Sequence, residues 1–149
     1  MRGLKASLYR EAAVKIELPS IREQQKVIFE KATREGIHQL KENLKAKTLP
    51  PQTEVDEALY SRNHLLRECE GWEAPAPEIV RAYFKHFQDH FPEYGTDKKL
   101  AALLGLSSDR RVREIKEGSR KAPYGVWRTF LVLTGRAPQE IVPVLAFMG

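Results

Sequence analysis

The stretch from Thr96 to Gly118 restricts the fold more than any other part of this chain, because it signals two short helices with almost no sequence between them. Thr96 is a helix-capping residue, and the leucines that follow it recur at three- and four-residue spacing, on one face of a first helix. Gly105 ends that helix, since glycine readily adopts the positive φ of a sharp turn. Ser107 or Ser108 can then cap a second short helix.

The second helix combines a thin apolar stripe with a basic remainder. Its apolar positions are Val112 and Ile115. Its cations are Arg110, Arg111, Arg113 and Lys116. Positions 96–136 hold ten Lys or Arg against four Asp or Glu, while the whole chain carries a net charge of +5, so the basic charge is concentrated around this helix. Two short helices joined by a tight glycine turn, the second one basic, indicate a helix-turn-helix motif.

Over residues 75–149 the chain resembles the helix-turn-helix domain of the Cro and lambda-repressor type. The residues that carry the resemblance are Leu100-Ala101, Leu104-Gly105, Val112, Ile115, Glu117-Gly118 and Pro123. The turn after Gly105 is one residue longer than is usual in that family. The resemblance implies a mainly α-helical domain of four to five helices that binds double-stranded DNA as a homodimer, typical of small bacterial, phage or plasmid repressors.

Two groups of residues are expected to meet the DNA. The residues expected to contact base edges are Asp109, Arg110, Arg113 and Glu114. An arginine can bond guanine O6 and N7 together, and a carboxylate can accept from cytosine N4 or hold an arginine in position. The residues expected to contact the phosphate backbone are Thr96, Ser107, Ser108, Arg111, Lys116, Arg120 and Lys121. The simpler alternative is a solvated, charged helix surface.

The rest of the second half predicts three more helices. Apolar and aromatic residues at helical spacing mark residues 77–90, which would pack across the two short helices, and residues 126–133, which end before Gly135. A last apolar helix is expected over residues 138–147, with Pro143 forcing a break in it.

The first half, residues 1–74, is expected to be a helical packing or dimerisation module. A short strand is predicted over residues 12–18, followed by two helices, 21–34 and 37–45, that Gly36 separates, and by a third helix over 53–69. The strand and the two helices also resemble a ribbon-helix-helix dimer, although few residues there could read bases. The helix-breaking segment 71–77, which contains Gly71, Pro75 and Pro77, is the predicted boundary with the second domain.

No enzyme, metal or cofactor site is expected. His86 and His90 have metal-binding spacing, but no cysteine stands nearby and no general base lies between them. The single Cys69 fits a reducing compartment, and neither a signal peptide nor a membrane segment is expected, because the first residues lack an apolar core and no apolar run has the length of a membrane helix. The sequence therefore predicts a cytoplasmic, nucleoid-associated transcriptional regulator. The alternatives are a module that binds another protein through residues 1–74 or the apolar C-terminal tail, and an accessory protein of plasmid maintenance or conjugation.

Overall fold

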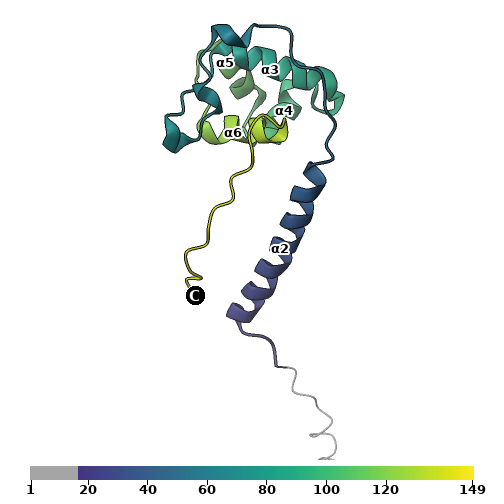
Figure 1. Cartoon of the computed structure of the whole chain (residues 1–149), viewed down its shortest axis with the longest axis vertical. Coiled ribbons are helices and arrows are strands. Elements are labelled where there is room, and N and C mark those ends of the chain that lie inside the picture. Colours follow the sequence, from purple (N-terminus) through teal and green to yellow (C-terminus); the bar gives the residue numbers. More distant parts are fainter. Residues whose placement is uncertain (1–16) are drawn as a thin grey trace, which may run out of the picture. The chain divides into compact units, whose positions relative to one another are not determined.

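The computed structural model describes residues 17–149, and these residues form helices and no strand (Figure 1). The expected mainly α fold is confirmed. The α-helices are α2 (Ile21–Asn43), α3 (Pro77–His90), α4 (Asp97–Leu104), α5 (Asp109–Glu117) and α6 (Tyr124–Leu133). Short 3-10 turns are η1 (Glu57–Leu59), η2 (Asn63–Leu65), η3 (Glu68–Glu70) and η4 (Pro92–Tyr94). Among the described helices, none has both the length and the apolar character needed to cross a membrane.

The chain divides into two compact units. One holds the described residues 17–48 together with Val144–Gly149, and the other is Leu49–Pro143. This differs from the predicted boundary at 71–77, because residues 49–76 pack against the helices that follow them. Prolines at 75 and 77 interrupt helix without separating the segment from the core.

In the first unit, α2 begins at a capping box. The Ser20 hydroxyl accepts from the Glu23 backbone N–H at 3.2 Å, and the Glu23 carboxylate accepts from the Ser20 N–H at 3.1 Å. The helix runs unbroken through Gly36, so the predicted split there is wrong. A glycine inside a helix costs only about 1 kcal/mol, and the cap and the polar residues around it offset that cost.

The second unit is built from α3, α4, α5 and α6, which lie together in Figure 1. The expected bounds of α3, α4 and α5 hold to within a residue, and α6 begins two residues earlier than predicted. The largest fully buried side chains come from all four helices: Trp127, Tyr83, Phe84, Phe130, Ile79, Leu100, Leu131, Val80 and Val112. Trp127 is the centre of this core, because its ring stacks on Phe130 at 5.4 Å and on Tyr83 at 5.7 Å between centroids.

The helix predicted over residues 53–69 is wrong, and the segment forms η1, η2 and η3 instead. Side chains compete with helical hydrogen bonds there: Gln52 Oε1 accepts from the Val55 N–H at 3.1 Å, and Asp56 accepts from the Ala58 N–H at 3.0 Å. Tertiary packing decides the rest, since Val55, Tyr60, Leu65 and Trp72 lie against the core and fit no single helix face.

The helix predicted over residues 138–147 is absent, because Pro143 lacks an N–H and the exposed apolar side chains around it gain no packing that would offset this loss. The predicted strand over residues 12–18 lies mostly outside the described residues, and Glu17 and Leu18, which are described, are not in a strand.

His64 joins residues 49–76 to the core. It is 4% exposed, and its Nδ1 accepts from the Trp127 indole N–H at 3.2 Å, so the folded protein holds the imidazole neutral. Burial lowers the pKa of His64 to about 4. Beside it, burial alone would raise the pKa of Glu57, but hydrogen bonds from the Tyr83 hydroxyl and Gln52 outweigh burial and lower that pKa.

The buried histidine predicts acid sensitivity. Because the His64 pKa falls from about 6.5 in the unfolded chain to about 4 in the fold, the unfolded state binds more protons between these values. Stability should therefore fall by about 2 kcal/mol from pH 7.5 to pH 5. Urea denaturation at both pH values measures this loss. In His64→Gln, which cannot titrate, the loss should be clearly smaller, and an equal loss in both proteins would contradict the assignment.

Candidate nucleic-acid interface

The two helices of the predicted helix-turn-helix motif are α4 and α5, and a tight turn joins them. Gly105 has φ of +72°, in the left-handed region where a side chain would be strained, and the Leu106 N–H returns to the Ala101 carbonyl at 2.8 Å. Ala101 is 2% exposed, and its small side chain occupies the buried side of α4 that meets the core. Val112 and Ile115, the two apolar residues of α5, are also buried. The opposite side of α5 therefore faces solvent.

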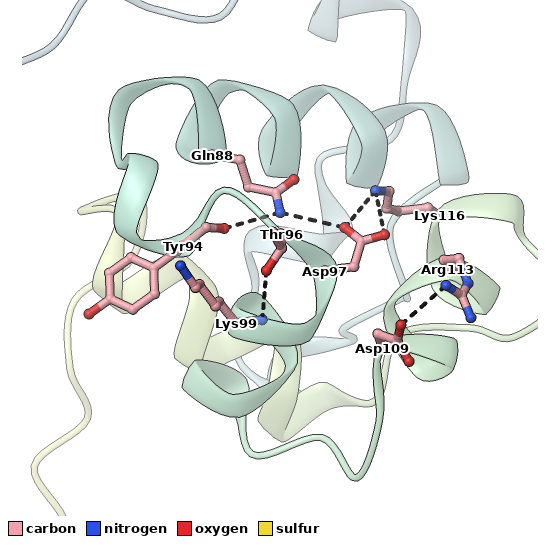
Figure 2. A network of polar contacts seen from close by, with 8 residues as sticks. All are labelled: Gln88, Tyr94, Thr96, Asp97, Lys99, Asp109, Arg113 and Lys116. Carbon is pink, nitrogen blue, oxygen red and sulfur yellow. Dashed lines mark hydrogen bonds and ion pairs between the residues drawn. The ribbon is translucent and has the colours of Figure 1, made fainter.

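Polar contacts hold the first turn of α4 against α5 (Figure 2). The Lys116 ammonium contacts both Asp97 oxygens, at 2.9 and 3.1 Å, and Gln88 of α3 donates to the Tyr94 carbonyl at 3.2 Å. Thr96 caps α4 by accepting from the Lys99 N–H at 3.3 Å. Lys116 is about three-quarters covered and bound to Asp97, so its position is that of a link between the two helices.

The four residues predicted to contact bases form two separate ion pairs along α5. Arg113 pairs with Asp109 at 3.2 Å, one turn earlier, and Arg110 pairs with Glu114 at 3.0 Å. Arg120, in the loop after α5, approaches the other Glu114 oxygen at 2.8 Å. Arg110 is highly exposed while Glu114 is mostly covered, so the carboxylate is the anchor and the two guanidinium groups lie around it.

A surface groove of about 530 Å³ lies next to the Arg110–Glu114 pair, because Arg120, which contacts Glu114, is one of its lining residues. Four of the seven predicted phosphate contacts line it: Ser107, Arg111, Arg120 and Lys121. Its floor is apolar, formed by Leu106, Ile115 and Pro123. α5 and the loop after it thus bring Arg111, Arg120 and Lys121 to one groove, although Arg111 is distant from the other two in sequence. Thr96 and Lys116 lie outside the groove, and Ser108 occupies the first position before α5 without a side-chain capping bond.

Sequence reasoning assigned no role to three residues that the structure places at this region. Lys98 and Lys99 are exposed in the first turn of α4, and their position directly after the Thr96 cap could have identified them. Arg81 of α3 donates to the Lys116 carbonyl at 2.7 Å, near the C-terminal end of α5. No local sequence signal predicts that bond, because the two residues are 35 positions apart.

The histidine pair of α3 is engaged in ordinary contacts. His86 Nε2 lies 2.7 Å from the Pro50 carbonyl, and His90 Nδ1 lies 2.8 Å from the His86 carbonyl. Over residues 17–149, no group of three or more His, Cys, Asp or Glu side chains is placed to hold a metal ion.

Comparisons with protein families, with curated proteins and with solved structures found no match for this chain.

Proposed function

We propose that this protein binds double-stranded DNA in a sequence-specific manner, with α5 in the major groove, and that it acts as a dimeric, cytoplasmic and nucleoid-associated transcriptional repressor of the Cro type. The observation that carries the proposal is the α4–Gly105–α5 arrangement, with Arg110 and Arg113 on the exposed side of α5 and a cationic groove next to it. The proposal includes no catalytic activity.

The ion pairs on α5 are compatible with base reading on energetic grounds. An exposed pair such as Arg113 with Asp109 contributes about 0–1 kcal/mol, whereas a bidentate arginine–guanine contact contributes roughly 1–3 kcal/mol of discrimination. A guanine can therefore displace the carboxylate. Until then the carboxylates hold each guanidinium close to α5, which lowers the entropy lost on binding.

The cationic groove supplies the sequence-independent part of the binding. Arg111 and Lys121 have no ion-pair partner among residues 17–149, so their charges are available to phosphate oxygens. Lys98 and Lys99 add two exposed cations at the start of α4, where the helix dipole also favours an anion. Two copies would read two half-sites about one helical turn apart, which is how a single short helix reaches useful specificity.

Selection from a pool of random duplexes at low and high salt tests the proposal. The pool should yield an inverted repeat, and affinity for it should fall steeply as salt rises. Lys121→Ala removes one phosphate contact from each copy, so it should reduce the slope of log affinity against log salt by roughly 1.8 for the dimer, and Lys47→Ala, an exposed lysine of the other unit, should leave the slope unchanged. Failure to bind any duplex at low salt would reject the proposal.

A second candidate, a module that binds another protein, is favoured by one observation. The C-terminal tail exposes a run of large apolar side chains, among them Leu145 at 94% and Met148 at 91%. A plasmid or conjugation accessory protein would use the same DNA chemistry as a repressor. The duplex selection separates the protein-binding module from both DNA-binding alternatives.

A further inference from the structure

The carboxylate of Glu114 is turned toward its own chain. Its side chain is 18% exposed, against 44% for Asp109 on the same helix, and its Oε2 atom is buried. The loop after α5 covers it. The Glu114 carbonyl accepts from the Arg120 N–H at 3.3 Å and from the Ser119 hydroxyl at 3.2 Å, which keeps the loop on this side of the helix. Little of the carboxylate is therefore left for contact with a base.

This carboxylate holds one arginine with each oxygen. Arg110, one turn earlier in α5, donates its Nε–H to Oε1 at 3.0 Å. The Nε of Arg120, in the loop, lies 2.8 Å from Oε2. Glu114 thus joins an arginine expected to contact a base to an arginine expected to contact a phosphate.

The pairing leaves the outer end of Arg110 free. A guanidinium carries one N–H on Nε and two on each terminal nitrogen. The terminal nitrogens of Arg110 have no hydrogen-bond partner among residues 17–149, so they can donate together to guanine O6 and N7 while Nε stays on Glu114. Arg113 differs, because its Nη1 is bonded to Asp109 at 3.2 Å and must give up that bond to read a base (Figure 2).

We propose that Glu114 is a positioning residue for base reading, which holds Arg110 by Nε and contacts no base itself. A side chain that is ordered before binding loses less conformational entropy in the complex, so the guanine contact gains in strength. The same carboxylate fixes Arg120, which keeps the base contact and the phosphate contact at a constant separation. This inference rests on the proposed binding of α5 to DNA, and it makes Arg110 the main base-reading arginine.

NMR signals of the arginine Nε–H groups measure the positioning without DNA. In Glu114→Met, which keeps the length of the side chain and removes both acceptor oxygens, the Nε–H of Arg110 and of Arg120 should exchange with water at least about fivefold faster than in the wild type. Asp109→Asn should leave both signals unchanged, because Asp109 pairs with Arg113. Equal exchange in the wild type and in Glu114→Met would overturn the inference.

A double-mutant cycle on DNA shows whether Glu114 acts through Arg110. Discrimination is measured as the ratio of the affinities for the duplex selected from the pool and for a scrambled duplex. Glu114→Met should lower this ratio at least about fivefold, and Glu114→Gln, which keeps one acceptor oxygen, should lower it less. In an Arg110→Ala background, Glu114→Met should lower the ratio no further. An equal loss in both backgrounds would show that Glu114 contacts a base directly, and would overturn the inference.

The control for charge is Glu73→Met, which removes a carboxylate at an exposed position outside α5. It should raise affinity for both duplexes slightly and leave the ratio unchanged. Among single changes, Arg110→Ala should cost more discrimination than Arg113→Ala, and the reverse order would contradict the role of Glu114. If no duplex is bound at low salt, the proposed function fails. If a duplex is selected and Glu114→Met discriminates as well as the wild type, the inference alone fails.

Discussion

Replacing Arg110 and Arg113 together by alanine is expected to lower affinity for the selected duplex at least about thirtyfold while leaving the fold unchanged. Each arginine would lose a bidentate base contact of roughly 1–3 kcal/mol, and every 1.4 kcal/mol is tenfold in affinity. Both side chains are exposed; Arg113 contacts a half-exposed Asp109, and the mostly covered Glu114 keeps its contact with Arg120 when Arg110 is removed, so stability should change by less than about 1 kcal/mol. Fluorescence anisotropy with the selected duplex and a scrambled one measures both affinities.

The control for this variant removes the same charge elsewhere. Arg67 pairs with Glu70 and Lys85 pairs with Asp89, as the two arginines of α5 pair with carboxylates of their own helix. Arg67→Ala/Lys85→Ala should bind the selected duplex with a loss of only a few-fold, through the lower net charge. If both double variants lose affinity equally, and for both duplexes, then α5 contributes charge and does not read bases.

Trp127→Ala is expected to destabilise the Leu49–Pro143 unit by about 3–5 kcal/mol, a large part of the stability of a small domain. The indole is fully buried, stacks on Tyr83 and Phe130, and lies 6.0 Å from Phe84 between centroids, so its removal leaves a cavity among three aromatic rings. It also leaves the Nδ1 of buried His64 without its donor. Urea denaturation followed by far-UV circular dichroism measures the change.

Two variants separate packing from hydrogen bonding at this site. Trp127→Phe keeps most of the ring but loses the N–H, and should cost clearly less than the alanine change. Trp72→Ala removes a half-buried indole that bonds the His64 carbonyl at 3.2 Å, and should also cost less. An effect of Trp127→Ala no larger than that of Trp72→Ala would contradict a core centred on Trp127.

The fold was predictable where helix signals are local. Thr96, Gly105 and Gly118 mark the ends of α4 and α5, and the apolar spacing of α3 identified its whole length. Prediction failed over residues 53–69. Apolar residues recur there near helical spacing, but each packs separately against the core and together they form no single helix face. It failed again over residues 138–147, where apolar composition suggested a helix that Pro143 does not permit.

The sequence by itself determined the helix-turn-helix pattern, because caps, glycines and periodicity act over a few residues and need no distant partner. It also placed the basic charge around α5. Only the tertiary structure decided which of those charges are free. The contacts concerned join residues far apart in the chain, such as Lys116 with Asp97 over 19 positions and Trp127 with His64 over 63. Such contacts depend on how the helices pack, and a one-dimensional pattern carries no information about that.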